Sequence, residues 1–317
     1  MHVVDIPMRV RFRRQDRRSA LLIHGDAGWG EFSPFPEYDD RVAARWLAAA
    51  REAADVGWPE PRRSEIPVNT TVPAVPAQQA HDMVAASGCR TAKVKVAEPG
   101  QTLADDEARV EAVRDALGPD GRLRIDANAA WTIDEAETAL RTLDRYDLEY
   151  AEQPVLTLEE MAALRRRVDV RLAADESIRT AADPMRVVGL EAADIVVLKV
   201  QPLGGVRACL RLAERCGLPV VVSSAIETSI GIAAGVALAA ALPALPYACG
   251  LGTVPLLDGD VCRPGLTPVA GLLPVVTTSP EPDLLARWAA DDELARWWQE
   301  RAERAQAVLD RSADDHG

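Results

Sequence analysis

The chain has 317 residues, 48% of them apolar, which is enough for one large α/β barrel with an appendage or for two domains. Acidic residues outnumber basic ones by 49 to 36, and the resulting net charge of −13 argues against a nucleic-acid-binding surface. The five cysteines form no CxxC pair, and the N-terminal segment lacks the apolar core of a signal peptide, so we expect a reduced, cytoplasmic protein.

The first 65 residues predict a small α+β unit. Three apolar, β-branched runs at 3–12, 19–25 and 28–35 are separated by polar turns and are typical of strands. Residues 39–57 begin with two aspartates and end at Gly57, a pattern that predicts an amphipathic helix. The proline-rich stretch that follows this helix indicates a domain boundary.

From Pro67 onward, short apolar runs alternate with helical segments rich in alanine, leucine and arginine. This alternation predicts parallel strands, and a count of about eight favours a closed barrel over an open doubly wound sheet. No GxGxxG or GxxxxGK(S/T) motif opens any of the helices, so a nucleotide-binding Rossmann or P-loop fold has no support. The expected strands are residues 68–72, 91–96, 123–127, 148–153, 170–176, 193–200, 219–225 and 246–250.

Two further segments follow toward the C-terminus. Residues 230–246 are apolar enough to suggest a membrane span, but Pro243 shortens the run, and its alanines and glycines are typical of a helix packed on a sheet. We therefore expect no membrane partner. After residue 275 the sequence predicts a long, charged helix, and we expect Trp288, Trp297 and Trp298 to pack back on the body of the protein.

Lysine occurs at only three positions, 93, 95 and 199, while the other 33 basic residues are arginines. Lys93 and Lys95 lie two apart in the expected strand TAKVKV and therefore share one of its faces. Arginine keeps its proton in proteins, whereas the pKa of lysine moves readily on burial or beside other charges. The three lysines therefore indicate proton chemistry or compact point charges, although chance retention of a few lysines would give the same count.

Active sites of such barrels lie at the C-terminal ends of the strands, where this sequence places polar groups at regular intervals. One carboxylate at a strand end can simply cap the next helix. Three of them on successive strands, Asp126, Glu152 and Asp175, would repel one another unless a cation lies between them. Oxygen ligands without a nearby histidine or cysteine favour one Mg²⁺ over Zn²⁺.

Lys95 and Lys199 would lie on opposite sides of that metal. The metal and Lys93 would both favour the neutral amine of Lys95, whose pKa would fall from about 10.4 toward the working pH. We therefore expect Lys95 to be the base that removes a proton next to a carboxylate, with Lys93 tuning it. Lys199 and the metal would stabilise the resulting enediolate. The expected partner is a small-molecule carboxylate substrate.

The motifs at the strand ends resemble those of the enolase superfamily. They are KVK at 93–95, DAN at 126–128, EQP at 152–154, ADES at 174–177 and KVQPLGG at 199–205. The KxK motif with a further lysine on the sixth strand is typical of the muconate lactonizing enzyme subgroup. Within that subgroup, the stretches SSAIETSIG, YACGLGT and GWGEFSPFPEYD are similar to the o-succinylbenzoate synthases of actinobacteria.

This resemblance implies a (β/α)7β barrel at residues 66–275 beneath an α+β capping domain, which residues 1–65 form and residues 276–317 complete. By the same resemblance, the three strand-end carboxylates bind Mg²⁺, Lys95 is the acid and base, and Lys199 is the cation that faces it. The implied reaction is the syn dehydration of 2-succinyl-6-hydroxy-2,4-cyclohexadiene-1-carboxylate to o-succinylbenzoate, a step of menaquinone biosynthesis.

Strands seven and eight end without a lysine or arginine. The remote carboxylate of the succinyl tail would therefore be held by hydroxyls, backbone N–H groups, water or an arginine of the cap segment 13–18. The glycines at these strand ends would serve equally well merely to turn the chain. The candidate substrate-binding residues are Asn128, Ser223, Ser224, Gly250 and Gly252.

Other activities stay open. The same lysines and metal serve N-succinylamino acid racemization and muconate cycloisomerization, whereas CGLGT lacks the paired aspartates that dipeptide epimerases carry there. A Schiff-base aldolase also uses a strand lysine but would not need three carboxylates. A non-catalytic metabolite-binding barrel would need neither both lysines nor all three acids. The sequence does not indicate the oligomeric state.

Overall fold

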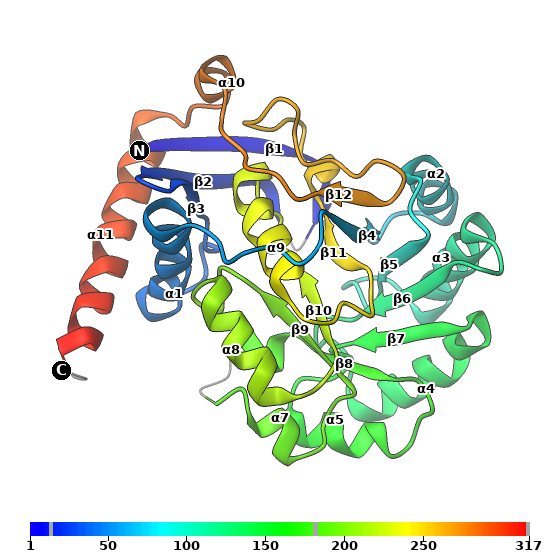
Figure 1. The fold of residues 1–317 in the computed structure, drawn as a ribbon. Coiled ribbons are helices and arrows are strands. Elements are labelled where there is room, and N and C mark those ends of the chain that lie inside the picture. The colour runs from blue at the N-terminus through cyan, green and yellow to red at the C-terminus, as the bar shows by residue number, and fades with distance from the viewer. Residues whose placement is uncertain (13–14, 180–182, 315–317) are drawn as a thin grey trace.

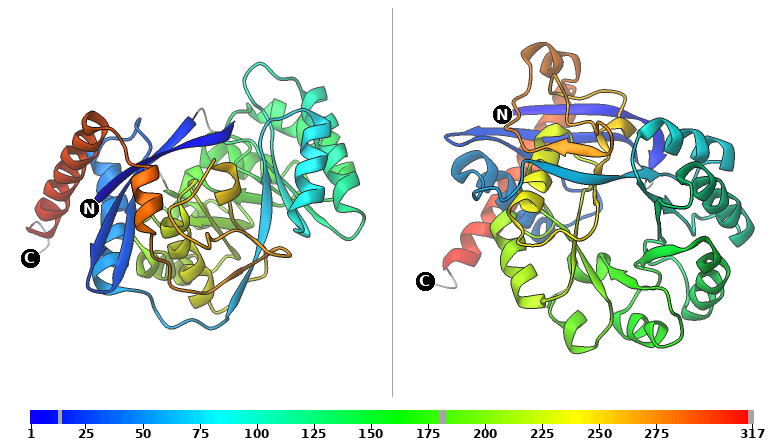
Figure 2. Two further views of the ribbon diagram at one scale, coloured as in Figure 1. Left: turned by 90° about the horizontal axis from the view of Figure 1, so that it is seen from above. Right: turned by 45° about the vertical axis from the view of Figure 1, so that its right-hand side comes forward.

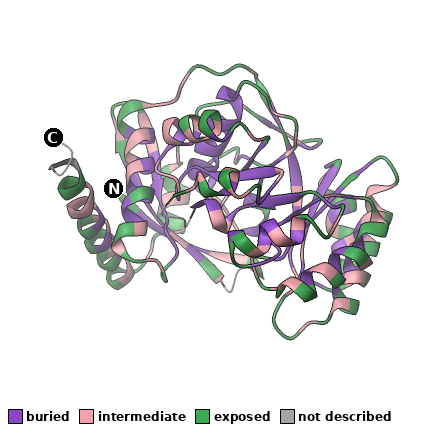
Figure 3. Cartoon of the chain, turned by 90° about the horizontal axis from the view of Figure 1, so that it is seen from below, coloured by how far each residue is buried: buried purple, intermediate pink, exposed green. Residues whose placement is uncertain are grey.

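The structure, a computed structural model, describes residues 1–12, 15–179 and 183–314 (Figure 1). A three-stranded antiparallel sheet forms the N-terminal part, and a ring of eight parallel strands follows it. Burial is concentrated on the strands and on the inner faces of the helices around them (Figure 3). The cap with its antiparallel sheet and the barrel have separate hydrophobic cores.

The barrel strands pair in chain order, and the last of them returns to the first to close the ring. Parallel pairing requires a connection along the outside between successive strands, and seven such connections are present in the described chain. The architecture is therefore the closed barrel that the pattern predicts, in the (β/α)7β form that the resemblance implies. Its strands are β4 (Glu65–Val72), β5 (Thr91–Lys95), β6 (Arg122–Asp126), β7 (Leu148–Glu152), β8 (Leu172–Ala174), β9 (Ile195–Lys199), β10 (Val220–Ser223) and β11 (Cys249–Gly252).

Helices cover the outside of the barrel (Figure 2). Three of them begin at a capping box. In each box a threonine side chain accepts a bond from the third backbone N–H of the helix, and the acidic side chain at that third position accepts one from the backbone N–H of the threonine. The threonines are 102, 132 and 157. These caps fix where the helices start. The connecting helices are α2 (Ala77–Ser87), α3 (Leu103–Leu117), α4 (Ile133–Leu143), α5 (Leu158–Arg165), α6 (Glu176–Arg179), α7 (Arg186–Gly189), α8 (Val206–Cys216) and α9 (Ser229–Ala241), with short 3-10 helices η2 (Asp144–Tyr146) and η3 (Val254–Leu256).

Helix α9 is buried along its whole length and contacts both the barrel and the N-terminal sheet. Two arginines satisfy its last carbonyl groups: Arg63 donates to Leu242 at 2.8 Å and Arg62 donates to Ala241 at 3.1 Å. This is the packed helix predicted for residues 230–246. Within the described residues, none of the helices has the length and apolar character needed to cross a membrane.

The cap is built from both ends of the chain. Helix α11 lies against α1 and β1, and its buried Trp298 meets Phe32 edge-on at 5.7 Å between ring centres. Trp297, which we expected to pack against the body, is exposed at 37%. The elements are β1 (His2–Phe12), β2 (Gln15–Gly25), β3 (Gly28–Phe32), α1 (Asp40–Arg51), the π-helical turn η1 (Glu52–Val56), α10 (Pro282–Arg287) and α11 (Asp292–Asp314), while β12 (Leu272–Pro274) pairs with β4.

The sequence identified most of these elements but named no helix at α2, α6 or α7 and no strand at β12. The exact limits expected for the two domains, at residues 65 and 275, stay predictions. Positions 13 and 14 belong to the expected cap loop and lie outside the described residues.

A buried polar network joins the cap to the barrel. Glu31 of β3 accepts bonds from the backbone and hydroxyl of Thr228, at 3.1 and 2.6 Å, and from the backbone N–H of Gly231 at 3.1 Å. These donors form the N-terminus of α9, where a negative charge is favourable. Arg18 donates from the cap to the carbonyl group of Ile226, at 3.1 Å. The cap is thus anchored by hydrogen bonds at the barrel end that carries the polar strand ends.

The buried carboxyl groups of Glu31 and Glu227 lie close together at this junction. Burial raises the pKa of Glu31 to about 7, and the charge of Glu227 adds to the shift. The folded chain therefore holds a proton that the unfolded chain loses near the ordinary value of 4.5. Glu31 consequently contributes stability below about pH 4.5, and this contribution is lost as the pH rises to about 7.

We expect Glu31→Gln to flatten the decline in unfolding free energy between these two pH values, a decline of up to about 3 kcal/mol from this group. Urea unfolding at a series of pH values measures it. Exposed Glu37→Gln is the matched control and should leave the profile unchanged. Parallel profiles for Glu31→Gln and the unmodified chain would contradict the expectation.

Candidate active site

The register of the parallel strands brings the polar strand ends to one mouth. Lys95 on β5 pairs in register with Asp126 on β6, and Asp126 pairs with Glu152 on β7. Across the mouth, Lys199 on β9 pairs in register with Ser223 on β10. Strands β5 and β9 are four places apart in either direction round the ring, so Lys95 and Lys199 come from opposite sides of it.

The two lysines of the KVK motif bond to two of the carboxylates. Lys93 Nζ lies 2.7 Å from Glu152 Oε2 and 3.3 Å from Asp126 Oδ2. Lys95 Nζ lies 2.5 Å from the same Asp126 oxygen and also donates to Asn128 Oδ1. No side chain in these ion pairs is more than 13% exposed. The charges therefore depend on one another rather than on water.

The third carboxylate has two cationic partners. Asp175 Oδ2 lies 2.6 Å from Lys199 Nζ, and its other oxygen accepts from Arg179 Nε at 3.1 Å. Arg179 also pairs with Glu176 at 2.6 Å. Sequence reasoning missed Arg179, although its position four residues after Asp175, on one helical turn, was a usable signal.

Burial and mutual repulsion shift the pKa values of the carboxyl groups. The pKa of Glu152 is raised to about 7, first by burial and then by the charge of Asp126. Burial also opposes ionisation of Asp126, but the ammonium groups of Lys95 and Lys93 outweigh it and hold its pKa well below the usual value. Glu152 is therefore the carboxylate with the greatest need for additional positive charge.

The pKa values of the two lysines of the KVK motif are shifted in opposite directions. Burial lowers the pKa of Lys95, Asp126 opposes this shift, and the charge of Lys93 reinforces it. Burial also acts against the charge of Lys93, but Glu152 and Asp126 outweigh it and raise its pKa. Lys95 is thus the easier of the two to deprotonate.

The chemistry of the three carboxylates fits a hard divalent cation. They are buried oxygen donors at the ends of three neighbouring strands, and ammonium groups satisfy them in this structure. With the lysines in those positions, no set of three acidic, histidine or cysteine side chains in the described ranges has the geometry of a metal site. Holding a cation would require the ammonium groups to turn away from the carboxylates.

A cavity of about 30 Å³ lies between the mouth and the cap. Phe12 and Phe35 close it from the cap, and Lys95 Nζ lies 5.2 Å from the centre of the Phe12 ring. This volume holds about one water molecule. A larger ligand therefore requires the cap side chains to move.

The structure brings most of the predicted site residues to this cavity. Ser224 Oγ lies 2.9 Å from Thr253 Oγ1, so two hydroxyl groups meet at one wall. Glu152 and Asp175 contact the lysines but do not line the cavity, and Gly252 does not reach it either. Thr253, Phe12 and Phe35 were missed by sequence reasoning. The predicted residues that line the cavity are Lys93, Lys95, Asp126, Asn128, Lys199, Ser223, Ser224 and Gly250.

The arginines of the cap segment do not line the cavity where they are described. Arg17 pairs with Asp5 at 2.5 Å, and Arg18 is buried and donates to backbone carbonyls. Arg13 and Arg14 lie outside the described residues.

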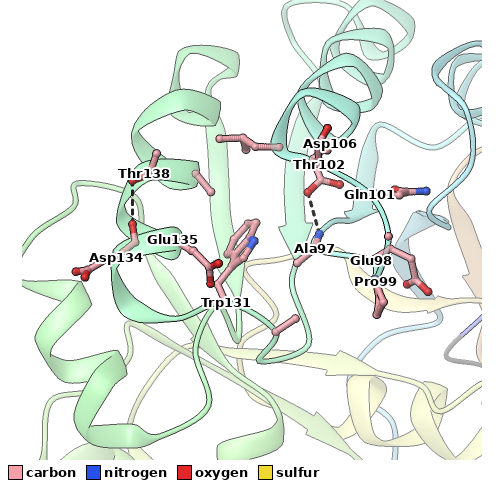
Figure 4. A pocket seen from close by; sticks show the side chains of 14 residues that line it. Ala97, Glu98, Pro99, Gln101, Thr102, Asp106, Trp131, Asp134, Glu135 and Thr138 are labelled. Carbon is pink, nitrogen blue, oxygen red and sulfur yellow. Dashed lines mark hydrogen bonds between the residues drawn. The ribbon is translucent and has the colours of Figure 1, made fainter.

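A separate hollow of about 550 Å³ opens between residues 97–106 and 130–139 (Figure 4). Trp131 forms part of its wall, and Asp106 Oδ2 accepts from the backbone N–H of Ala97 at 2.9 Å. None of the predicted site residues lines this hollow. The candidate active site is therefore the smaller cavity at the strand ends.

Comparisons with known sequences cover almost the whole chain. Residues 76–280 match the enolase C-terminal domain-like family, and residues 3–54 match the enolase N-terminal domain-like family. The chain is 60% identical over 312 residues to the o-succinylbenzoate synthase of Thermobifida fusca (strain YX), covering 98% of both chains. It is 51% identical over 311 residues to that of Mycobacterium tuberculosis (strain H37Rv), covering 98% of this chain and 94% of the relative.

Solved structures share the fold at lower identity. Muconate lactonizing enzyme from Pseudomonas fluorescens, complexed with muconolactone, has a TM-score of 0.78 and is 21% identical, covering 91% of this chain and 97% of its own. N-succinyl Arg/Lys racemase from Bacillus cereus ATCC 14579 has a TM-score of 0.75 at 21% identity, covering 92% of this chain and 96% of its own.

The position of Gly252 predicts a packing role. A Cβ atom there would lie 2.7 Å from the backbone oxygen of Asn69 on β4, where β11 closes the barrel. We expect Gly252→Ala to destabilise the fold by about 1–3 kcal/mol, because backbone cannot rotate aside. In Gly250→Ala the new Cβ atom would lie 2.5 Å from Ser223 Oγ. Because the serine side chain can rotate, we expect Gly250→Ala to lose less stability than Gly252→Ala. Thermal melts of both variants measure the difference, and an unchanged melt for Gly252→Ala would exclude the packing role.

Proposed function

This chain belongs to the enolase superfamily and, within it, to the o-succinylbenzoate synthases, and we propose that the lysine–carboxylate mouth of its barrel performs their reaction. The reaction is the dehydration of 2-succinyl-6-hydroxy-2,4-cyclohexadiene-1-carboxylate, in which a ring C–H bond and a ring C–O bond break and the ring becomes aromatic. The chain is thus a lyase of menaquinone biosynthesis. We expect it to act in the cytoplasm.

The observation that carries the assignment of the site is the pair of lysines on opposite strands. Lys95 and Lys199 come from strands β5 and β9, with the carboxylates of β6, β7 and β8 between them. A substrate carboxylate between the two lysines would place its neighbouring C–H bond within reach of an amine. A base with a lowered pKa and a fixed cation facing it are what removal of such a proton requires.

Lys95 is the acid and base in this proposal. Its neutral amine takes the proton from the carbon that carries the ring carboxylate. It then gives a proton to the hydroxyl group that departs from the adjacent carbon. Water leaves, and Lys95 returns to its starting state. Because a syn elimination places both groups on one face of the ring, one lysine serves both steps.

Lys199 and Lys93 supply fixed positive charge. The ammonium group of Lys199 faces Lys95 and stabilises the negative charge that develops on the substrate carboxylate as the proton leaves. Lys93, whose pKa is raised by Glu152 and Asp126 against the effect of burial, keeps its proton and disfavours one on Lys95. This division explains why two lysines lie on one strand face.

Asp126, Glu152 and Asp175 would hold one Mg²⁺, the cation that enzymes of this superfamily generally use. When bound, it would supply positive charge to the substrate carboxylate. The raised pKa of Glu152, first from burial and then from the charge of Asp126, supports this assignment, because a buried carboxylate in that state gains from an added cation.

The succinyl tail would meet hydroxyl groups rather than a guanidinium. Apart from the three lysines, no cationic side chain in the described part of the chain lines the cavity. Ser223, Ser224 and Thr253 lie at its wall, and Gly250 leaves room beside Ser223. We therefore propose the two serines and Thr253 as donors to the remote carboxylate.

Racemization of an N-succinylamino acid is the second candidate activity. Two lysines that face each other are able to remove a proton from one face of a carbon and return it to the other. Incubation of an N-succinylamino acid in D₂O tests this activity, since exchange with inversion requires both lysines.

A Schiff-base aldolase has less support, because each lysine is held by a carboxylate as an ion pair. Borohydride with substrate would trap such an enzyme.

Removal of the metal should stop the dehydration. We expect EDTA to abolish formation of o-succinylbenzoate and added MgCl₂ to restore it. Asp175→Asn should reduce the rate by about a thousandfold, since it removes a charge from the ligand set and leaves shape unchanged. Far-ultraviolet circular dichroism should show an intact fold. Exposed Asp169→Asn is the control and should keep full activity. Full turnover by metal-stripped enzyme would refute the metal site.

Arginine substitutions separate the roles of the two lysines. Lys95→Arg keeps the charge but removes the transferable proton, so we expect the rate to fall by about 10²–10⁴-fold. Lys199→Arg keeps the cation and should retain more activity, limited by the fit of the larger guanidinium. Initial rates and solvent exchange of the substrate's α-proton measure both. Equal and mild losses in the two variants would contradict these roles.

A further inference from the structure

Gln153 follows Glu152 at the end of β7 and is the least explained of the buried polar residues at the mouth. It is fully buried, and its backbone has a φ of +38°, a left-handed conformation that residues other than glycine rarely adopt. Its side chain does not line the cavity. A buried, strained residue next to a proposed metal ligand requires a physical reason.

The side-chain amide of Gln153 uses its whole hydrogen-bonding capacity on the loop that carries Asp175 and on its own loop. Oε1 accepts from the backbone N–H of Asp175 at 3.0 Å and of Ser177 at 3.1 Å. Nε2 donates to Ser177 Oγ at 2.7 Å and to the carbonyl of Val155 at 2.9 Å, and it also contacts the weak acceptor Met161 Sδ at 3.3 Å. An amide group has two donors and two acceptor positions, and all four are engaged.

The backbone of Gln153 extends the same connection to a third strand. Its N–H donates to the carbonyl of Ala173 on β8 at 2.8 Å, and its carbonyl accepts from the N–H of Ala129 at 2.7 Å. Ala129 follows the end of β6, where Asp126 lies. The loops that carry the three buried carboxylates are therefore joined at one residue.

We propose that Gln153 is the positioning residue that fixes the separation of the carboxylates of Glu152 and Asp175, and thereby sets the affinity of the mouth for a divalent cation. The proposal rests on the metal role assigned above. Gln153 touches neither substrate nor metal; it acts by holding the backbone N–H of Asp175 at a fixed place relative to the turn that begins at Glu152. Partners of metal ligands that act in this way typically contribute 10–100-fold to metal affinity.

The test is a calorimetric titration of the metal-stripped protein with MgCl₂ alone, compared with Gln153→Met. Methionine keeps the length of the side chain and removes the four hydrogen bonds. We expect the Kd for Mg²⁺ to rise by about 10–100-fold. The melting temperature is measured without metal on the same samples, so that loss of stability and loss of metal affinity are recorded separately.

Gln201→Met is the matched control. Gln201 is also a buried amide that follows a barrel strand, but it bonds to none of the loops that carry the three carboxylates: its partners are the backbone N–H and hydroxyl of Ser33 in the cap, both at 3.1 Å, and Glu227 at 3.4 Å. We expect it to lower the melting temperature while the Kd for Mg²⁺ changes less than about threefold, within ordinary variation. If Gln153→Met does not fold, Ser177→Ala replaces it, because it removes only one partner of the amide and should raise the Kd several-fold.

The outcomes are distinguishable. If the unmodified chain binds no Mg²⁺, the metal site itself falls and this proposal with it. If the unmodified chain binds Mg²⁺ and folded Gln153→Met, or Ser177→Ala in its place, binds it equally well, the metal site stands and the positioning role is overturned. An equal rise in Kd for Gln153→Met and Gln201→Met also overturns it, since the effect would then be general loosening of the fold.

Discussion

Burying an ammonium or carboxylate group away from water costs several kcal/mol unless an opposite charge lies within a few ångströms. At the barrel mouth three carboxylates and three lysines meet this requirement together, with ion-pair distances of 2.5 to 3.3 Å. Leaving any one of them unpaired would make the site unstable. The register of strands β5 to β9 is what brings these charges within reach of one another.

The junction between cap and barrel meets the same requirement by different means. Glu31 lies among backbone N–H and hydroxyl donors at the start of α9 rather than beside a lysine. Arg18 donates to backbone carbonyls on the facing loop. Hydrogen-bond donors fixed in the backbone cannot turn away, whereas the lysines at the mouth can. The junction is therefore suited to holding the cap in place, and the mouth is suited to exchanging one cation for another.

The sequence predicts much of this arrangement because two of its signals are local. Alternation of apolar strands and helices gives the barrel, and the spacing of Lys95, Asp126, Glu152 and Asp175 matches one strand and helix each. Helix α2 was missed because its apolar face is narrow, with only Ala80 and Val84 buried. Phe12 was missed as a wall of the cavity because its contact with Lys95 joins residues far apart in the sequence, and no local pattern reports such a contact. Gly252 was placed in the site because a glycine that approaches a ligand and one that approaches a neighbouring strand look alike in a sequence.

The cap, finally, takes its core from both ends of the chain. Phe32 near the start and Trp298 near the end face each other inside it, and the buried Arg301 bonds to the backbone carbonyl of Phe35 at 2.8 Å. During synthesis the N-terminal sheet leaves the ribosome before the barrel, and helix α11, which packs on it, is made after the barrel. The barrel strands all emerge in between. The N-terminal sheet is thus synthesised before the barrel but has a complete core only once α11 has been added.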